Sequence, residues 1–574
     1  MNCDVAIIGG GPAGSTVGSL LKKYNPALKV SIFEAEQFPR DHVGESQLPA
    51  LMNVLVEMGV WDKVEAANFP IKIGGTYVWG RHADLWDLEF IPGERFVDQP
   101  RPAKFVGQRA ETAFQVDRSI YDKVLLDHAA SLGCEVYEAT RIAKVNRSDD
   151  RVTSIEASDG QTVRARHYVD ASGNAGILRK TMEIPIENPT ALQNIALYEY
   201  WQDADWAVTL GNGGTRIQVI SIGWGWIWFI PITETRTSVG LVVPAKYYKA
   251  SGKSTEELYA AAIAESPFIS GLLRNAKREG KLHGTRDWSF IADRLTGENW
   301  ILAGDTCGFA DPILSAGLTL AQTGSSKVAT CILELDKGSL DPKWIRDEYE
   351  KTQRSQIRHH IRFADYWYTA NGRFTDLREL CSEIAKTAGL DLGADDAFRW
   401  LATGGFALED PGVPRSSTFR VGAIKYIGQF FSGEAADWVI NRTNVFRLNL
   451  EGASKELFAF WQPGRIRQVD CYRRNHKVLP LANVYSFVFA ALQEQSDGMR
   501  MVNRCVTMIT SHRRGFDPAA ARLFVLEALE SLIAEGWVTA GIDESRPFLE
   551  MVTPEESTMI HRNRDNVVFE TVEA

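Results

Sequence analysis

The sequence predicts an α/β fold in which a parallel-sheet domain is interleaved with an antiparallel β domain, followed by a mainly α C-terminal domain. Three observations lead to this prediction. A strand, a glycine-rich turn, a helix and a parallel strand open the chain as a βαβ unit at residues 3–34. Long alternating β segments follow at residues 197–243. Beyond residue 342 the hydrophobic pattern becomes mostly helical.

The predicted elements follow one another along the first 340 residues. The strands of the opening unit are residues 3–8 and 30–34, and residues 13–24 between them have the period of a helix. A second helix is expected at 119–132, with strands at 135–137, 152–157 and 167–170. The antiparallel insertion contributes strands at 216–222, 225–232 and 237–243, and a helical stretch from 254 to 277 follows it. A strand at 299–303 leads through a glycine-rich turn into a helix at 317–335.

Composition excludes several classes of protein. The 574 residues carry 63 basic and 73 acidic side chains, a net charge of −10, which argues against a nucleic-acid partner. There is no signal peptide and no apolar run of membrane-spanning length, so we expect a cytoplasmic protein with no membrane partner. The seven cysteines are scattered and odd in number, which favours reduced thiols and gives no support to a metal site.

A glycine-rich turn lies between the first strand and the first helix, with the order Gly9-Gly10-Gly11-Pro12-Ala13-Gly14. In this position a G-x-G-x-x-G motif binds a dinucleotide. Gly9 permits the tight turn, Gly11 lets the backbone approach a pyrophosphate, and Gly14 lets the helix pack closely. Glu34 ends the second strand, where a carboxylate accepts hydrogen bonds from ribose hydroxyls. A structural turn beside a surface glutamate is the alternative, and it leaves the combination unexplained.

Three later segments indicate which dinucleotide binds. They are Val116-Asp117-Arg118, Tyr168-Val169-Asp170-Ala171-Ser172-Gly173 and Leu302-Ala303-Gly304-Asp305. With the glycine turn, they resemble the FAD-binding, Rossmann-type proteins of the p-hydroxybenzoate hydroxylase fold. The resemblance implies that Asp305 meets the ribityl and pyrophosphate part of FAD, and that the helix beginning near Gly317 stabilises the reduced flavin with its positive end. The FAD residues expected are Gly9, Gly11, Pro12, Ala13, Gly14, Glu34, Arg40, Glu45, Arg118, Asp305 and Leu318. For Arg118 and Glu45, surface ion pairs are the alternative.

Two further features bear on the reaction. Residues 225–231 contain the pattern W-x-W-x-I-P, and in a strand Trp226, Trp228 and Ile230 share one face. Taken alone, these side chains are equally well explained as a core stripe. Lys72 lies in an apolar, glycine-containing strand region, where a single lysine is ordinarily a surface residue with a buried stem.

Together these features resemble the flavin-dependent halogenases over roughly residues 5–321. The shared segments are the glycine turn, Val43-Gly44-Glu45-Ser46, Lys72, W-x-W-x-I-P and Asp311-Pro312-Ile313-Leu314-Ser315-Ala316-Gly317. The combination of Lys72, W-x-W-x-I-P and the segment at residues 311–317 is far more specific to this family than the glycine turn is. Leu314 and Thr306-Cys307 depart from the commonest pattern, which leaves the choice between chloride and bromide open. No residue is assigned as a general acid or base.

The resemblance implies a reaction at two separate places. Reduced FAD, supplied by a separate reductase, reacts with O₂ and with chloride or bromide held by backbone N–H groups near Ala316 and Gly317, and hypohalous acid results. The oxidant travels to Lys72, which hydrogen-bonds it or forms a haloamine and delivers electrophilic halogen to the substrate. A desolvated lysine suits this task because its lowered pKa makes the amine nucleophilic. The wall of the tunnel is expected to be Trp226, Trp228, Ile230 and Pro231.

Within the family, the chain most resembles the type that acts in chloramphenicol biosynthesis. Arg286-Asp287-Trp288-Ser289-Phe290 resembles its D-W-S segment, whose aspartate is esterified to the flavin 8α-methyl group. Asp287 is therefore a candidate for covalent FAD attachment, and a strand-end aspartate that caps or pairs is the alternative. Residues 529–539 resemble its winged-helix-like ending. We expect residues 1–340 to form the halogenase module and residues 341–574 to cover the substrate tunnel.

An FAD-dependent aromatic hydroxylase of the same fold, which reduces its own flavin with NAD(P)H, is the main alternative function. Lys72 and W-x-W-x-I-P favour the halogenase over it. A third alternative is a protein that keeps FAD without redox chemistry. The family halogenates carrier-bound acyl groups, phenols and pyrroles, so the substrate stays open between a free small molecule and one bound to a carrier protein. An antibiotic or other secondary-metabolite pathway is expected.

Overall fold

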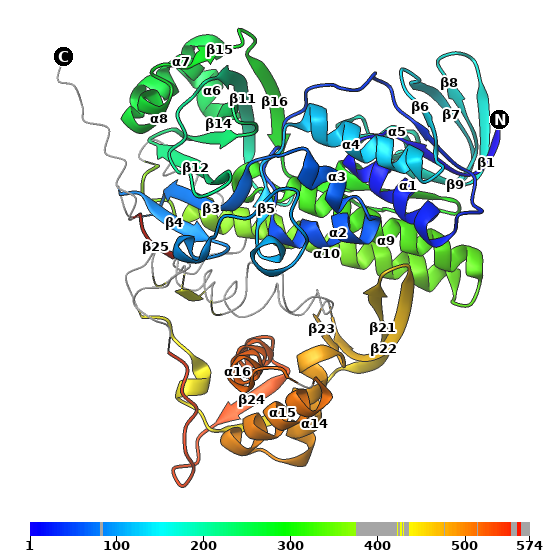
Figure 1. The fold of residues 1–574 in the computed structure, drawn as a ribbon. Helices are drawn as coiled ribbons and strands as arrows, with labels where there is room; N and C mark the ends of the chain where they lie inside the picture. Colours follow the sequence, from blue (N-terminus) through cyan, green and yellow to red (C-terminus); the bar gives the residue numbers. More distant parts are fainter. Residues whose placement is uncertain are drawn as a thin grey trace. The chain divides into compact units, whose positions relative to one another are not determined.

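The computed structural model describes residues 1–80, 84–374, 422, 425–426, 429, 435–475, 477–513, 515–552 and 560–563, apart from the side chains of Asp287 and Trp288. The chain forms two compact units (Figure 1). The first comprises Met1–Ala388, Pro463–Arg465 and Ser557–Ala574, and the second comprises Gly389–Gln462 and Ile466–Glu556. Every residue predicted to bind the cofactor or to react lies in the first unit.

A seven-stranded sheet carries the nucleotide-binding half of the first unit. Its parallel strands are ordered β6 (Glu135–Tyr137), β2 (Val30–Phe33), β1 (Asn2–Ile8), β9 (Thr162–Asp170) and β18 (Trp300–Leu302). The antiparallel strands β8 (Arg151–Ala157) and β7 (Ile142–Ser148) continue beyond β9. Helix α1 (Pro12–Tyr24) leaves β1 through the glycine turn and packs against α4 (Arg118–Ser131) and α9 (Gly317–Lys337). The predicted βαβ opening and the helices predicted at 119–132 and 317–335 are confirmed.

The second large sheet has ten strands. Its main path is β15 (Lys277–Arg278), β11 (Gln193–Gln202), β14 (Arg236–Pro244), β13 (Gly225–Pro231), β12 (Gly214–Ile222), β3 (Ile71–Val78), β4 (Trp86–Glu89) and β25 (Ile560–Arg562). In addition, β16 (His283–Trp288) pairs with β11 and β5 (Ala113–Phe114) pairs with β3. Only β3 and β12 run parallel among these pairs of described strands. The predicted antiparallel insertion is confirmed, and strands that precede it by more than a hundred residues widen the sheet.

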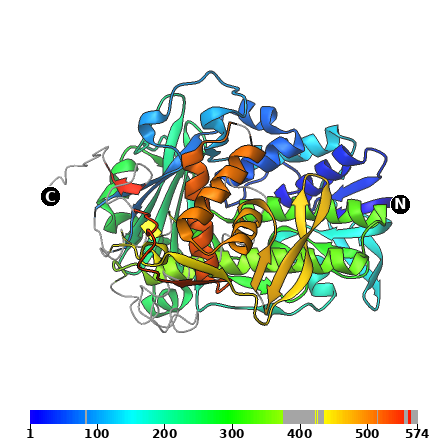
Figure 2. The same ribbon diagram turned by 90° about the horizontal axis from the view of Figure 1, so that it is seen from below.

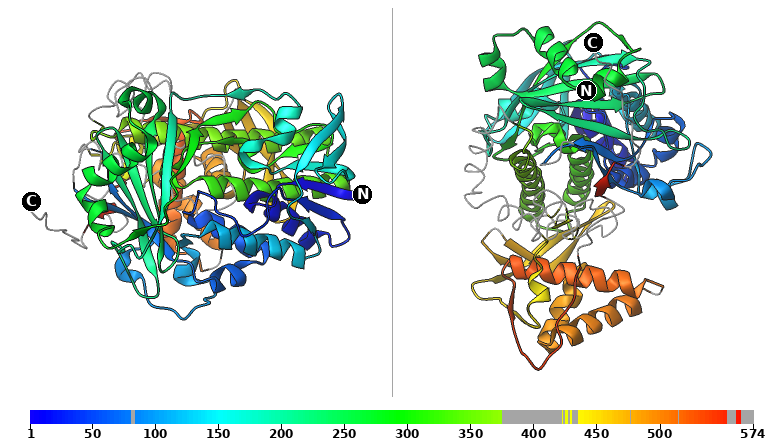
Figure 3. Two further views of the ribbon diagram at one scale, coloured as in Figure 1. Left: turned by 90° about the horizontal axis from the view of Figure 1, so that it is seen from above. Right: turned by 90° about the vertical axis from the view of Figure 1, so that its left-hand side faces the viewer.

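One face of this sheet is covered by helices, as Figure 3 shows for the green part of the chain. The helices α7 (Thr255–Glu265) and α8 (Pro267–Leu272) bury their apolar side chains against strand residues such as Leu197, Phe229 and Leu241. The sequence predicted one helical stretch from 254 to 277. The structure divides it, because Ser266 caps a new helix that begins at Pro267, and the stretch ends as strand β15.

A β-bulge interrupts the pairing of β3 with β12 beside Lys72. Lys72 pairs with Thr215, but the next residue of β12, Arg216, pairs with Gly74. The extra residue, Ile73, shifts the alternation of side chains along β3, because a bulge re-aims the residues around it. Ile71 and Ile73 pack together in a small apolar cluster. Lys72 therefore projects from the opposite face of the strand.

The first unit contains further helices and a third sheet. They are the helices α2 (Pro49–Met58), α3 (Trp61–Ala66), α5 (Ile177–Thr181), α6 (Ala245–Ser251) and α10 (Pro342–Thr369), and a small sheet of β10 (Ile186–Glu187), β17 (Phe290–Ala292) and β19 (Gly308–Phe309). Helix α10 packs against α9, and its Tyr349 hydroxyl donates to the carbonyl of Leu302 at 2.7 Å. No helix within the described ranges combines the length and apolar character needed to cross a membrane.

The described residues from 435 to 552 contain three packed helices, α14 (Asn483–Glu494), α15 (Gly498–His512) and α16 (Pro518–Ala534) (Figure 2). Strand β20 (Val445–Leu448) pairs with β24 (Val538–Gly541), and β21 (Ser454–Gln462), β22 (Arg465–Arg474) and β23 (Lys477–Pro480) form a separate sheet. Residues 529–539, which were expected to resemble a winged-helix-like ending, lie in the last part of α16 and the first part of β24. The other strands were not predicted, and the winged-helix-like designation stays a prediction.

Candidate active site

The glycine turn after β1 has no room for side chains at two positions. A Cβ atom on Gly9 would lie 2.3 Å from the carbonyl oxygen of Ala171, and one on Gly14 would lie 1.9 Å from the carbonyl oxygen of Gly9. Gly9 also has a φ of 106°, which favours glycine. At Gly11 the nearest atom to an added Cβ would be a guanidinium nitrogen of Arg40, 3.5 Å away. The turn is therefore closed toward the protein and accessible on the side of Gly11.

Glu34 is held at the end of β2 by backbone donors. Its Oε2 accepts a hydrogen bond from the N–H of Gly10 at 2.7 Å, and its Oε1 accepts one from Glu36 at 2.9 Å. These contacts fix a carboxylate beside the glycine turn. The arrangement suits a ribose diol next to a pyrophosphate.

A cavity of about 640 Å³ begins at the glycine turn and reaches the ten-stranded sheet. The predicted residues that line it are Gly9, Gly11, Pro12, Ala13, Glu34, Arg40, Glu45, Arg118, Trp226, Trp228, Ile230, Asp305, Gly317 and Leu318. The residues Gly14, Lys72, Pro231 and Ala316 do not line it. Asp287 lies on β16 opposite Asn194, and its side chain lies outside the described residues. A dinucleotide fits this cavity, because a turn open at Gly11, a fixed carboxylate and an apolar wall follow one another along it.

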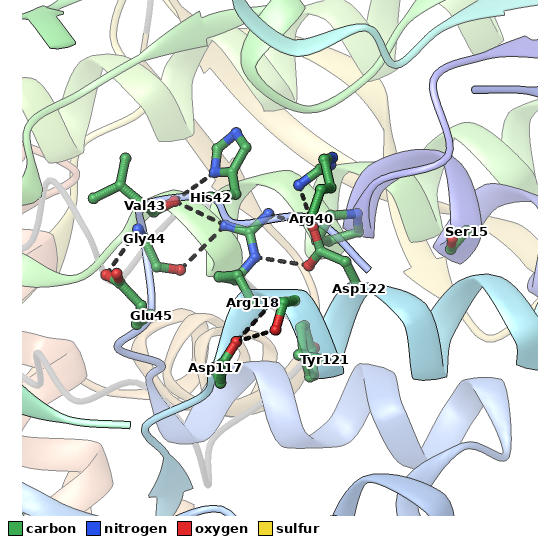
Figure 4. A network of polar contacts seen from close by, with 12 residues as sticks. Ser15, Arg40, His42, Val43, Gly44, Glu45, Asp117, Arg118, Tyr121 and Asp122 are labelled. Atoms are coloured by element: carbon green, nitrogen blue, oxygen red, sulfur yellow. Dashed lines mark hydrogen bonds and ion pairs between the residues drawn. The ribbon is translucent and has the colours of Figure 1, made fainter. Parts of the chain in front are cut away.

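Arg118 lies at the centre of a buried polar network (Figure 4). It forms a bidentate pair with Asp122, with N···O distances of 2.7 and 2.9 Å, and donates to the carbonyl oxygens of Val43 and Gly44. Arg40 also pairs with Asp122 at 3.2 Å. Arg40 pairs with Glu36 as well, at 3.4 Å, so two guanidinium groups and two carboxylates lie together here. Both guanidinium groups line the cavity, where they can donate to an anionic ligand. The alternative that Arg118 is part of a surface ion pair is wrong.

Two carboxyl groups of the cavity wall have raised pKa values. Burial raises the pKa of Asp305 to about 6, although the charge of Arg118 opposes the shift. Burial also raises the pKa of Glu45, whose Oε2 accepts from the N–H of Gly44 and whose Oε1 accepts from the hydroxyl of Tyr200. Glu45 is only 2 % exposed, so a surface ion pair is excluded for it as well.

Lys72 is 3 % exposed, so it is not a surface lysine with a buried stem. Its Nζ donates to Oγ of Ser315 at 3.4 Å and lies 5.3 Å from the centre of the Phe90 ring. Burial lowers the pKa of this amine to about 7, and no carboxylate among the described residues pairs with it. Ser315 lines the cavity, so it connects the cavity to Lys72.

The two tryptophans of W-x-W-x-I-P border the cavity and are also buried in the sheet, which combines the two roles considered for them. The indole N–H of Trp228 donates to Oγ of Ser238 at 3.1 Å. A Cβ on Gly240 would lie 2.1 Å from the Trp228 ring, so that glycine makes room for the indole. The indole N–H of Trp226 donates to the hydroxyl of Tyr368 at 2.8 Å. No sequence motif marked Tyr368.

A group of metal-ligand side chains lies elsewhere in the first unit. Asp87, Glu89 and His561 come together at the β4 and β25 pairing. Arg216 forms ion pairs with both carboxylates. The group is therefore a buried ion-pair network, in which the guanidinium already supplies the positive charge.

Comparison with known sequences gives one family. Residues 4–99 and 90–378 match the family model described as tryptophan halogenase. A 1H-pyrrole-2-carbonyl-[peptidyl-carrier protein] chlorinase of Pseudomonas fluorescens is 32 % identical over 392 residues, which is 65 % of this chain and 85 % of the relative. A tryptophan 2-halogenase of Chondromyces crocatus is 29 % identical over 377 residues, which is 64 % of this chain and 68 % of the relative.

Solved structures agree with this assignment. The flavin-dependent halogenase CmlS superposes with a TM-score of 0.72 at 24 % identity, covering 96 % of this chain and 98 % of that one, and this likeness shows the fold. The myxobacterial chondrochloren halogenase CndH superposes with a TM-score of 0.60 at 28 % identity, covering 71 % of this chain and 92 % of that one.

Proposed function

This chain belongs to the tryptophan halogenase family of flavin-dependent halogenases, and we propose that it makes hypohalous acid from reduced FAD, O₂ and a halide and transfers the halogen through Lys72. Enzymes of this family use FAD and a halide. One observation carries the proposal for this chain: the buried amine of Lys72 contacts Ser315, which also lines the cavity. That contact gives an oxidant made in the cavity a route to the lysine.

The residues of the glycine turn and the cavity wall would hold FAD. Gly11 and the first N–H groups of α1 would receive the pyrophosphate, with positive charge from Arg40, and Glu34 would accept from the ribose. Asp305 would face the ribityl chain, and the positive end of α9 would face the flavin. When bound, reduced FAD supplies the two electrons and two hydrogens that, with O₂, a halide and a proton, give hypohalous acid, oxidised FAD and water.

Lys72 would then act as the carrier of the halogen. The neutral amine attacks the halogen of hypohalous acid, an N–halogen bond forms, and the proton leaves with hydroxide as water. Transfer of the halogen to a substrate carbon returns an N–H bond to the amine when the carbon loses its proton. Backbone N–H groups of Ala316 and Gly317 would hold the halide. The side chains of Trp226, Trp228 and Ile230 would separate the flavin from the substrate.

We propose a substrate that is an acyl or aromatic biosynthetic intermediate, free or attached to a carrier protein. The relative from Pseudomonas fluorescens is named for a pyrrole-carbonyl group on a peptidyl carrier protein, which supports the carrier-bound form. A separate flavin reductase would supply the reduced FAD. An NAD(P)H-dependent aromatic hydroxylase is not favoured, because the family match and the environment of Lys72 both point to halogenation.

The test is a reconstituted assay with the protein, FAD, a flavin reductase, NADH and either chloride or bromide. Free aromatic acids and their carrier-protein thioesters serve as substrates, and intact mass is the readout. We expect a mass gain of one halogen in place of one hydrogen. NAD(P)H oxidation without the reductase, together with a mass gain of one oxygen, would instead establish the hydroxylase.

A further inference from the structure

Four buried polar side chains join the tryptophan wall of the cavity to the turn that precedes α9. They come from four separate parts of the chain: Asn194 in β11, Trp226 in β13, Asp311 in the turn and Tyr368 in α10. None is more than 3 % exposed. The Tyr368 hydroxyl accepts from the Trp226 indole at 2.8 Å and donates to Oδ1 of Asp311 at 3.3 Å. The Asn194 amide donates to Tyr368 at 3.2 Å and to Oδ2 of Asp311 at 3.3 Å.

Asp311 fixes the backbone that leads to Ser315. Its Oδ1 accepts from the N–H of Ile313 at 2.9 Å, which caps the short helical turn 312–314. Ser315 ends that turn in a left-handed conformation with a φ of 56°, unusual for a residue with a side chain. The turn therefore needs support from its surroundings to hold Ser315 against Lys72.

A second carboxyl group, Asp365, lies one helical turn before Tyr368 and accepts from the hydroxyl of Thr190. Burial raises the pKa of Asp365 to about 8 and that of Asp311 to about 7, and the charge of Asp311 raises the pKa of Asp365 further. Oδ1 of Asn194 has no donor among the described residues. A proton on Asp311 would supply one after rotation of the Asn194 amide. This group of side chains is therefore compatible with a neutral Asp311.

We propose that Tyr368 and Asp311 are positioning residues that hold Trp226 and the 311–317 turn in one fixed arrangement and thereby keep the oxidant on its path to Lys72. The inference rests on the proposed function. Tyr368 is the hydrogen-bond partner of the Trp226 indole in the described structure. Without that hydroxyl the ring keeps its apolar contacts but loses its fixed orientation, and the wall beside the turn opens.

The test is Tyr368→Phe, which removes one oxygen atom. FAD retention and the rate at which O₂ reoxidises the reduced enzyme should stay within about twofold of wild type. Loss of a hydrogen bond worth about 1 kcal/mol should lower halogenated product per reduced FAD consumed by about fivefold. Free hypohalous acid, trapped with monochlorodimedone, should rise by the corresponding amount. Tyr366→Phe, on the same helix and outside this group, is the matched control.

Variants at two further positions keep the inference testable if Tyr368→Phe folds poorly. Trp226→Phe removes the donor from the other end of the same hydrogen bond, so its effect on thermal stability and that of Tyr368→Phe should combine to less than their sum. Asp311→Asn resembles the neutral carboxyl and should keep the product ratio near that of wild type, whereas Asp311→Leu should not. Additive effects, or an unchanged ratio of product to free acid in Tyr368→Phe, would overturn the inference. Wild type that makes neither product nor free hypohalous acid would instead overturn the proposed function.

Discussion

The Nζ atom of Lys72 lies 3.4 Å from Oγ of Ser315, although 243 residues separate the two in the sequence. Lys72 comes from β3 of the ten-stranded sheet, and Ser315 comes from the turn before α9, which packs on the nucleotide-binding half. This contact is where the two halves of the first unit meet around the proposed chemistry.

Lys72→Ala should abolish halogenation and leave FAD binding and oxygen consumption unchanged. The amine is the only group in the proposed route that carries the halogen to the substrate, while the cofactor cavity does not include it. Product formation by mass spectrometry measures the loss of halogenation, and flavin absorbance of the purified protein and an oxygen electrode measure FAD binding and oxygen consumption. Lys144→Ala, at an exposed strand position, is the control. Retained halogenation in Lys72→Ala would refute the role of the lysine.

Lys72→Met should stabilise the protein, and the gain should shrink as the pH rises. Burial lowers the pKa of Lys72 to about 7, while the unfolded chain keeps the ordinary value of 10.5. Between these values unfolding takes up a proton, so wild-type stability increases with pH there and is lowest near and below pH 7. Thermal unfolding of both proteins from pH 6 to 9.5 measures the difference. A constant difference would mean that Lys72 titrates normally.

Ser315→Ala should lower halogenation by about tenfold, because the net value of a hydrogen bond to a partly charged group is about 1.5 kcal/mol. The lysine stays buried in this variant, but its Nζ loses the oxygen that orients it. Ser326→Ala, farther along α9, removes a hydroxyl that bonds to Glu57 and should leave the rate unchanged. Steady-state rates at saturating halide separate the two variants. Equal rates in Ser315→Ala and wild type would show that the contact is incidental.

Gly240→Ala should destabilise the protein by about 1–3 kcal/mol and increase leakage of the oxidant. The added Cβ would lie 2.1 Å from the Trp228 ring and would displace it from the cavity wall. Gly541→Ala has no atom within 4 Å of the new Cβ and serves as the control. Denaturant unfolding and hypohalous acid trapping report on the two effects. A Gly240→Ala protein with normal stability would contradict the packing described here.

FAD should stay attached to the polypeptide after denaturation, through Asp287. This expectation comes from the resemblance of the Asp287 segment to the D-W-S segment of the chloramphenicol type, and the backbone places the residue on β16, a strand of the ten-stranded sheet. In-gel flavin fluorescence after SDS denaturation should be positive for wild type and negative for Asp287→Asn. Asp293→Asn, beyond β17, is the control. Flavin released from wild type would show that FAD is bound without a covalent link.

Local motifs predicted the nucleotide-binding half well. The turn at Gly9, the helix after it and the strand that ends in Glu34 depend on residues close in sequence, so a single sequence is sufficient to assign them. The helix beginning at Gly317 was predictable for the same reason. The positions of Arg118 and Glu45 around the cavity were suggested only by resemblance, and their burial required the folded chain.

Long-range packing accounts for what the sequence could not predict. The burial of Lys72 depends on the register between β3 and β12, which are more than a hundred residues apart. The sequence around Tyr368 predicts a helix but gives no sign of a role for this residue. Its hydrogen-bond partners Trp226 and Asp311 come from distant segments. Strands β21 and β22 were missed because the first four residues of β21 are exposed and five of the ten residues of β22 are charged, which weakens the apolar pattern.

Because of the bulge at Ile73, the direction of the proposed reactive lysine depends on the number of residues in β3. If one residue were deleted between Lys72 and Gly75, β3 could pair regularly with β12 and every proposed reactive side chain would still be present. Lys72 would still oppose Thr215, but β3 would lose the bend and added twist that the bulge gives it beside the lysine, and the direction of the side chain toward Ser315 would change. Enzymes engineered from this scaffold should therefore preserve the count of residues in this strand as strictly as they preserve the lysine itself.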